Sequence, residues 1–306
     1  MSPKFPTPLQ KLESKFLETH QIHLYVKRDD TIHPEISGNK WRKLKYNLEE
    51  AKKQNHETLL TFGGAFSNHI LAVAAAAREQ GLNSIGIIRG DELSPESNPT
   101  LRRVSELGMQ LKFVRREKYK LRNEPNFQEE LISKYGSCYT LPEGGSNALA
   151  VKGCTEIIDE IDIDFDYIVT AVGTGGTLAG LACGLNEKQS ALGISVLKNV
   201  HYLDEKVSRL IQAYAGKPRA NWSIDHEGHC GGYGKFDKDL IAFVNQFYSE
   251  YKIPLDPIYT GKMTKALFDL IEKKHFPLGT TIVALHTGGL QGILGFNEKY
   301  GDLIVL

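Results

Sequence analysis

The chain has 306 residues, and its 37 Lys and Arg residues balance its 37 Asp and Glu residues, which gives a formal net charge of zero at pH 7. This balance argues against a nucleic-acid-binding protein, because such a protein needs a basic surface to displace the counterions of phosphate groups. Hydrophobic residues make up 41% of the chain and charged residues 24%, which excludes a disordered or fibrous protein. At about 150 residues per domain, the length predicts roughly two domains.

The sequence contains no segment typical of a membrane or secreted protein. The longest apolar run, residues 70–77, is far shorter than the roughly 18 residues of a membrane span, and residues 1–8 contain no apolar signal region. The cysteines are too sparse for a disulfide scaffold and too widely spaced for a zinc site: Cys138, Cys154, Cys183 and Cys230. We therefore expect a cytoplasmic protein with reduced cysteines, no membrane partner and no metal.

Short apolar strand-like runs alternate with amphipathic helical patterns along the chain. Strands are expected at residues 24–26, 58–62, 84–88, 111–114, 167–170, 193–197 and 281–285. Helices are expected at residues 43–53, 68–80, 100–108, 126–134, 149–161, 204–214, 238–251 and 262–274. This alternation predicts an α/β fold with mostly parallel sheets flanked by helices. Because no flexible linker separates two halves, two domains would be interlocked.

Two predicted strands end in glycine-rich turns that open helices, Gly63 to His69 and Gly173 to Thr177. Ligands of parallel sheets bind at the carboxyl ends of the strands, and a helix N-terminus favours an anion such as phosphate. The second turn lacks the third glycine of a dinucleotide fingerprint and the Gly-Lys-Ser/Thr of a P-loop, which argues against a nicotinamide enzyme and favours a single phosphate. Taken alone, either turn could also be a plain connection between strand and helix.

A lysine, Lys40, lies in the segment Ser37-Gly-Asn-Lys-Trp-Arg-Lys43. A partly buried lysine near other cations has a lowered pKa and can act as a Schiff-base nucleophile at neutral pH. By itself the segment could be the solvated start of a helix. A Schiff-base lysine together with a phosphate site is what pyridoxal 5'-phosphate requires, so the combination predicts this cofactor.

Five motifs follow one another in order: Ser37-Gly-Asn-Lys-x-Arg-Lys-Leu44, Gly63-Gly-x-x-Ser-Asn-His69, Gly173-Thr-Gly-Gly-Thr177, Asp256-Pro-Ile-Tyr-Thr-Gly-Lys262 and His286-Thr-Gly-Gly289. From about residue 24 to residue 292, the chain thereby resembles the D-cysteine desulfhydrase/1-aminocyclopropane-1-carboxylate deaminase family of fold type II pyridoxal-phosphate enzymes. The resemblance implies two interlocked domains, a large cofactor-binding domain of residues 1–45 and 146–306 and a small inserted domain of residues 46–145. It also implies a homodimer with a small amino acid as substrate.

The resemblance also implies roles for individual residues. Lys40 would bind the cofactor as a Schiff base, and Asn68 would hydrogen-bond its phenolic oxygen. Its phosphate would be held by Gly173, Thr174, Gly175, Gly176 and Thr177, with Lys43 nearby. The substrate carboxylate would be bound by Ser67, Asn68 and His69, and two active-site tyrosines of the deaminases would correspond to Tyr233 and Tyr259. Structural alternatives stay open: Ser67 and Asn68 as helix caps, Tyr233 as a packed loop aromatic, and His286 as a core histidine.

Two positions distinguish the reactions of this family. In the deaminases a glutamate that pairs with the pyridine nitrogen follows the second tyrosine, and a leucine follows the histidine of the last motif, whereas this chain has Thr260 and Thr287. Both threonines are expected beside the cofactor, and a neutral partner for the ring nitrogen suits β-elimination.

We therefore expect a lyase that converts D-cysteine to pyruvate, ammonia and hydrogen sulfide. Lys40 is expected to remove the α-proton, with Tyr259 or Tyr233 as the alternative group. Three other functions stay open: 1-aminocyclopropane-1-carboxylate deaminase, elimination from another β-substituted or D-amino acid, and a non-catalytic pyridoxal-phosphate-binding protein.

Overall fold

The computed structural model describes residues 3–305, which form ten strands and twelve α-helices. The strands are β1 (Leu9–Leu12), β2 (His23–Lys27), β3 (Thr58–Gly63), β4 (Asn83–Arg89), β5 (Gln110–Val114), β6 (Tyr139–Leu141), β7 (Tyr167–Val172), β8 (Ser190–Ser195), β9 (Trp222–Asp225) and β10 (Thr281–Leu285). The helices are α1 (Lys15–His20), α2 (Asn39–Lys53), α3 (Asn68–Gln80), α4 (Pro99–Glu106), α5 (Arg116–Lys120), α6 (Pro125–Tyr135), α7 (Ala148–Asp159), α8 (Gly176–Gly184), α9 (Tyr202–Ala215), α10 (Lys238–Tyr251), α11 (Thr260–Glu272) and α12 (Gln291–Tyr300).

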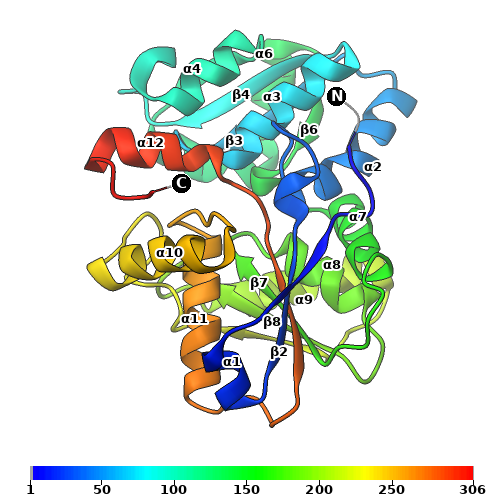
Figure 1. The fold of residues 1–306 in the computed structure, drawn as a ribbon. Helices are drawn as coiled ribbons and strands as arrows, with labels where there is room; N and C mark the ends of the chain where they lie inside the picture. Colours follow the sequence, from blue (N-terminus) through cyan, green and yellow to red (C-terminus); the bar gives the residue numbers. More distant parts are fainter. Residues whose placement is uncertain (1–2, 306) are drawn as a thin grey trace.

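The strands form two sheets, which Figure 1 shows in the two halves of the molecule. One sheet has the order β1-β2-β10-β7-β8-β9 and the other the order β5-β4-β3-β6. All neighbouring strands are parallel except β1 and β2. Parallel neighbours need crossover helices, which cover both faces of the sheet. The α/β fold with mostly parallel sheets is therefore confirmed.

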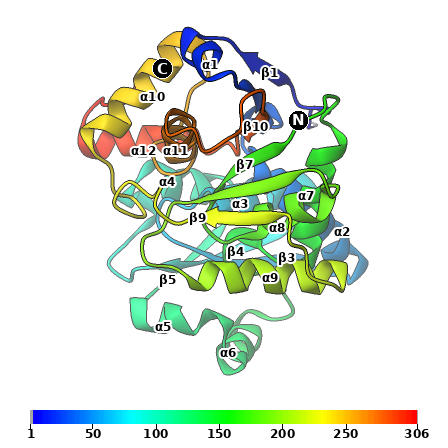
Figure 2. The ribbon, with the colours of Figure 1, turned by 90° about the horizontal axis from the view of Figure 1, so that it is seen from below.

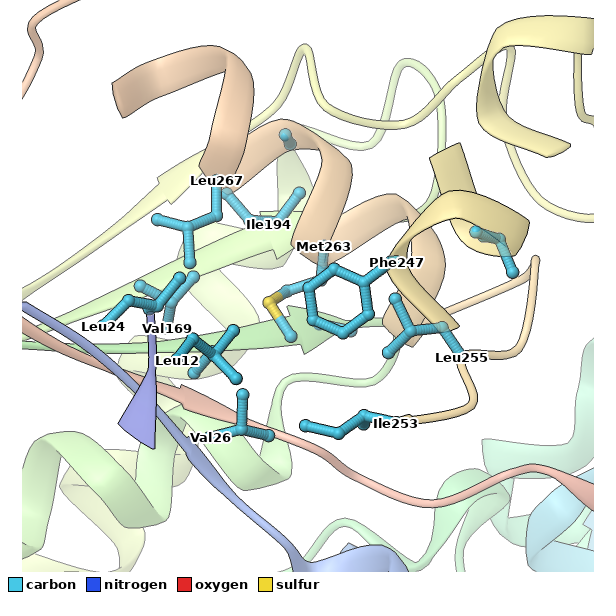
Figure 3. Close-up of a cluster of buried hydrophobic side chains, with 14 of the residues drawn as sticks. Leu12, Leu24, Val26, Val169, Ile194, Phe247, Ile253, Leu255, Met263 and Leu267 are labelled. Atoms are coloured by element: carbon cyan, nitrogen blue, oxygen red, sulfur yellow. The ribbon is translucent and has the colours of Figure 1, made fainter. Parts of the chain in front are cut away.

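The six-stranded sheet is buried on both faces, because successive side chains of a strand point to opposite sides. In β10, Ile282 and Ala284 pack on the side of α10 and α11, whereas Val283 and Leu285 pack on the side of α7, α8 and α9. Figure 2 shows these two groups of helices on either side of the sheet. Figure 3 shows the first core, where the side chains of the strands meet Phe247 of α10 and those of α11.

The four-stranded sheet is covered in the same way. Ile85 and Ile87 of β4 pack with α5 and α6, while Ile88 packs with α2, α3 and α4. The apolar run 70–77 lies in α3 and is buried along its whole length. Within residues 3–305, none of the helices has both the length and the apolar character to cross a bilayer.

Two helices connect the halves of the molecule. Helix α2 runs without a break across positions 45 and 46, and α12 returns to lie beside α4 (Figure 1). Arg102 of α4 forms an ion pair with Glu298 of α12, with 3.2 Å between Nη2 and Oε1. The division into residues 1–45 plus 146–306 and residues 46–145 stays a prediction.

Candidate functional site

A cavity of about 1320 Å³ lies where the two sheets meet, and residues at the carboxyl ends of β3, β4 and β7 line it. This is the edge at which parallel sheets bind their ligands. The cavity brings together these predicted site residues: Lys40, Lys43, Ser67, Asn68, His69, Gly173, Thr174, Gly175, Thr177, Tyr233, Tyr259 and Thr287. Gly176 and Thr260 are buried beside the cavity and do not line it.

Lys40 lies in the first turn of α2, and its Nζ donates to Oδ1 of Asn39 over 2.8 Å. Enclosure by the protein disfavours the charged amine and lowers the pKa of Lys40 to about 8. The amide of Asn39 also donates to Oγ1 of Thr177 over 2.8 Å. Asn39 therefore links the lysine to the second glycine-rich turn.

Gly38 sets the direction in which Lys40 enters the cavity. It has a φ of +63°, and a Cβ there would lie 1.9 Å from the carbonyl oxygen of Thr287. Only glycine accepts both the left-handed conformation and this close backbone contact. Gly38 is the N-cap of α2 and has no side chain to cap it, so the helix begins at Asn39. The sequence predicted a later start, at residue 43.

Arg42 fixes the start of α2 through buried ion pairs. It is fully buried, and its guanidinium donates to Asp29 over 3.0 and 3.1 Å and to Oε2 of Glu160 over 2.9 Å. Lys27 also donates to this oxygen over 2.9 Å. Burial alone raises the pKa of Glu160, but the hydrogen bonds from Arg42 and Lys27 outweigh it and lower the pKa to about 2. These paired charges hold the helix that carries Lys40.

The turn between β7 and α8 forms an anion cradle, residues 173–177. Gly175 has a φ of +84°, and α8 begins at Gly176 without a side-chain cap, which leaves the first N–H groups of the helix without intrahelical partners. Lys43 is buried beside the cradle and donates to Gly144 O and Ser146 Oγ, each over 3.0 Å. Burial, and next the charge of Lys40, lower the pKa of Lys43 to about 7. A bound phosphate would restore the charged form of this amine.

Ser67 and Asn68 lie at the N-terminus of α3. Ser67 is its N-cap, with the side chain accepting from the N–H of Ile70 over 3.3 Å. The amide oxygen of Asn68 accepts a hydrogen bond from Gln291 over 2.9 Å. Both side chains therefore have structural contacts. The backbone N–H groups of Asn68 and His69 lie in the first turn of the helix, where a carboxylate is favoured, and both residues line the cavity.

His69 is buried and neutral. Thr61 donates its hydroxyl to Leu141 O over 3.1 Å, so it accepts from Nε2–H of His69 over 2.8 Å. Burial, and next the charges of Lys40 and Lys43, hold the pKa of His69 well below its usual range. Its Nδ1 has no partner among residues 3–305. His69 thus presents an acceptor rather than a positive charge, and only its backbone N–H suits a carboxylate.

Tyr233 and Tyr259 come together at the cavity. The hydroxyl of Tyr259 donates to that of Tyr233 over 3.2 Å, and the rings meet edge to face with 5.9 Å between centroids. Burial holds the pKa of Tyr259 well above its usual range, and partial desolvation raises the pKa of Tyr233, 45% of which stays exposed. Both are therefore protonated at neutral pH. Because Tyr259 donates to Tyr233, the proton of Tyr233 is free to be donated to a ligand.

The two threonines that the sequence places beside the cofactor differ in position. Thr287 lines the cavity, whereas Thr260 donates its hydroxyl to Oδ2 of Asp256 over 2.7 Å. Asp256 is buried and also accepts from the N–H groups of Tyr259 and Thr260, over 2.7 and 2.9 Å. This carboxylate caps α11 and thereby fixes Tyr259.

His286 packs as a core residue. Its Nε2 donates to Pro254 O over 2.7 Å, and its Nδ1 accepts from the N–H of Gly288 over 3.2 Å. The histidine therefore holds the loop that carries Thr287.

No role was predicted from the sequence for Asn39, Ser146 or Asp256. Asn39 and Asp256 lie within two of the recognised motifs, and Ser146 follows the glycine pair Gly144-Gly145. A glycine pair shortly after a strand is the signal that could have indicated Ser146, since the turns that contain Gly63-Gly64 and Gly175-Gly176 also line the cavity.

Comparisons with known proteins identify the family of the chain. The family model described as pyridoxal-phosphate dependent enzyme matches residues 2–288. The chain is 34% identical over 326 residues to the bifunctional D-cysteine desulfhydrase/1-aminocyclopropane-1-carboxylate deaminase, mitochondrial, of Arabidopsis thaliana, a match that covers 98% of this chain and 80% of the relative. It is 31% identical to a D-cysteine desulfhydrase of Yersinia pestis, covering 96% of this chain and 94% of the relative.

A solved structure described as an ACC deaminase homologue superposes with a TM-score of 0.88 at 30% identity, covering 99% of this chain and 95% of that one. A hydrogen sulfide-producing enzyme of Fusobacterium nucleatum has a TM-score of 0.67 at 17% identity, covering 92% of this chain and 95% of that one, and this more distant likeness concerns the fold alone.

Proposed function

Because the chain belongs to the family of pyridoxal-phosphate dependent enzymes, we propose that it is the lyase that converts D-cysteine to pyruvate, ammonia and hydrogen sulfide. One observation carries the proposal: the amine of Lys40, with a pKa near 8, opens into a cavity between an anion cradle and two protonated tyrosines. An amine with this pKa is both a nucleophile and a base near neutral pH.

The residues present fit the cofactor. Lys43 is a buried amine with no carboxylate within ion-pair distance among the residues that the structure describes, so it lacks the negative charge that a phosphate would bring. We assign the phosphate to residues 173–177 and Lys43, and the phenolic oxygen to Asn68. Because Thr260 donates to Asp256 and does not line the cavity, we assign the ring nitrogen to Thr287 in place of Thr260. When bound, the cofactor supplies an electron sink for the negative charge that develops at Cα.

The chain's own residues have separate roles in the elimination. The N–H groups at the start of α3 hold the substrate carboxylate, and Nζ of Lys40 takes the proton from Cα. The Cβ–S bond breaks, the sulfur leaves with the electron pair, and Tyr233 Oη donates a proton to it while Tyr259 holds the tyrosine in place. Water hydrolyses the released 2-aminoacrylate to pyruvate and ammonia.

The proposal is tested by offering D-cysteine and 1-aminocyclopropane-1-carboxylate in parallel to the purified protein loaded with cofactor. We expect pyruvate and sulfide from D-cysteine and no 2-oxobutyrate from the cyclopropane. The opposite result would show that the reaction is not decided by the neutral threonine at position 287. It would establish the second candidate, the deaminase, whose two active-site tyrosines correspond by resemblance to Tyr233 and Tyr259.

The tyrosine pair gives a separate prediction. Tyr233→Phe removes the proton that leaves with the sulfur, and we expect turnover of D-cysteine to fall by roughly 10² to 10⁴ fold. Tyr259→Phe should have a smaller effect, because this hydroxyl donates only to Tyr233. Tyr248→Phe, on α10, is the matched control. Steady-state rates for the three variants check the order, and equal rates for Tyr233→Phe and the control would contradict the assigned role.

Cofactor uptake should depend on pH through Lys40. Only the neutral amine attacks an aldehyde, and with a pKa of about 8 roughly a tenth of it is neutral at pH 7. The rate at which the cofactor-free protein takes up pyridoxal phosphate should therefore rise with pH and level off above pH 8. The visible absorbance of the attached cofactor, followed over time, measures this rate. A rate that keeps rising about tenfold per pH unit between pH 8 and 10 would contradict the lowered pKa.

The domain boundaries at positions 45/46 and 145/146, the homodimer and the cytoplasmic location belong to the same proposal. The four-stranded sheet supports the boundaries, since its strands all lie between residues 58 and 141. Light scattering coupled to gel filtration tests the homodimer, and a mass of one chain would refute it.

A further inference from the structure

Several cations line the cavity besides Lys40 and Lys43, and three of them lie around Tyr119 and Glu143. Arg89 ends β4, Arg122 follows α5, and Lys206 lies in α9. We call these three side chains the Arg89 cluster. Its members come from three separate elements, and all of them line the cavity.

The positive charges of the Arg89 cluster outnumber the carboxylates that pair with them. One carboxylate, Glu143, lies among the three cations, and it accepts hydrogen bonds from Arg122 over 2.8 Å and from the hydroxyl of Tyr119 over 2.7 Å. Arg89 and Lys206 have no carboxylate within ion-pair distance among the residues that the structure describes. Burial, together with the charge of Arg122, lowers the pKa of Lys206 in spite of Glu143. The cluster is therefore ready to receive an anion.

Arg89 lies close to where a substrate would be held. Its Nη2 is 3.4 Å from the position that a Cβ on Gly64 would occupy, and Gly64 lies in the turn that leads to the N-terminus of α3. Its guanidinium carbon is 5.8 Å from the ring centroid of Tyr119, and its charge counteracts the rise in the pKa of Tyr233. Arg89 is thus close to the predicted carboxylate site, and its charge acts on the proposed acid.

Neither the cofactor nor the α-carboxylate accounts for the Arg89 cluster. The phosphate has its own cradle with Lys43, and the α-carboxylate has the N-terminus of α3. Building on the proposed function, we infer that the Arg89 cluster binds an anionic group carried on Cβ of the substrate, such as a sulfonate or a phosphate ester. The planar fork of an arginine suits such groups, because it donates two parallel hydrogen bonds.

The reaction balances without a further reactant. The α-proton passes to Nζ of Lys40, the Cβ–S bond of a sulfonate or the Cβ–O bond of a phosphate ester breaks, and sulfite or phosphate leaves with the electron pair. Water hydrolyses the 2-aminoacrylate to pyruvate and ammonia. The Arg89 cluster would stabilise the departing anion, as it would the sulfide that leaves D-cysteine.

Binding is tested apart from turnover with aspartate and asparagine, which share a shape, differ in charge and carry no leaving group on Cβ. Calorimetric titration of the cofactor-loaded protein with each enantiomer gives the dissociation constants. We expect aspartate to bind about 10- to 100-fold more tightly than asparagine. Arg89→Gln should remove this preference and Arg89→Lys should keep part of it. Arg115→Gln removes a charge next to β5, outside the cavity, and should leave the preference unchanged.

Two outcomes would overturn the inference. Equal binding of aspartate and asparagine to the wild type would show that no anion is preferred. Equal weakening of both ligands by Arg89→Gln would show that Arg89 holds the α-carboxylate instead. Pyruvate release from cysteate or O-phosphoserine is measured in parallel with release from D-cysteine. Absence of pyruvate from all three substrates would refute the proposed function. The charge preference is judged separately, from the dissociation constants of aspartate and asparagine.

Discussion

Lys40→Ala is expected to abolish the visible absorbance of the attached cofactor and to lower turnover by at least about 10³-fold. The replacement removes both the nucleophile that holds the cofactor and the base that takes the α-proton. The fold should survive, because Nζ of Lys40 makes a single hydrogen bond, to Asn39. Absorbance spectra and pyruvate formation measure the two effects.

Lys45→Ala is the matched control for this prediction. Lys45 lies one turn further along α2 and pairs with Glu156 over 2.7 Å, outside the cavity. We expect the absorbance spectrum and the turnover of Lys45→Ala to match those of the wild type. An unchanged cofactor band in Lys40→Ala would refute the assignment and would direct attention to Lys43, the other buried lysine of the cavity.

Arg42→Met is expected to lower the free energy of unfolding by about 3 to 5 kcal/mol. The guanidinium is fully buried, and its removal leaves the carboxylate of Asp29 without its charged partner in the interior. Glu160 would keep only Lys27 as a charged partner. Urea unfolding followed by circular dichroism measures the loss.

Arg103→Met tests whether this cost comes from burial. Arg103 pairs with Glu35 and Glu106 on the surface, where 45% of its side chain is exposed. Surface ion pairs contribute about 0 to 1 kcal/mol, so this variant should be close to the wild type. A loss below about 1 kcal/mol for Arg42→Met as well would show that the buried cluster does not anchor α2.

Much of the fold follows from local patterns. All seven expected strands are present as β2, β3, β4, β5, β7, β8 and β10. Strands inside the sheets have apolar stretches that a parallel sheet buries on both faces, whereas β5 lies at an edge and is only partly buried. The strand expected at 193–197 lies at 190–195, where pairing with β7 sets its ends. Strands β1, β6 and β9 escaped prediction because they are short and carry too few apolar residues. Helix α12 escaped because two glycines interrupt its pattern.

The site could be predicted only as far as its motifs extend. Lys40, Lys43 and the cradle lie in continuous segments, so their meeting at one edge follows from the strand ends. The partners of Arg42 lie 13 and 118 positions away in the chain, and no local pattern connects them. The same is true of Arg89, which appears in the sequence as an ordinary charged residue at the end of a strand. Thr260 faces Asp256 because the helix N-terminus there takes a carboxylate cap.

Lys40 is the residue that we propose to hold the cofactor in this cavity. Borohydride reduction of the cofactor-loaded protein makes the attachment permanent, and fragmentation mass spectrometry of the peptides then identifies the modified lysine. We predict one pyridoxyl phosphate group per chain, on Lys40, with Lys43 unmodified. A modified Lys43, or a chain without modification after reduction, would contradict the account.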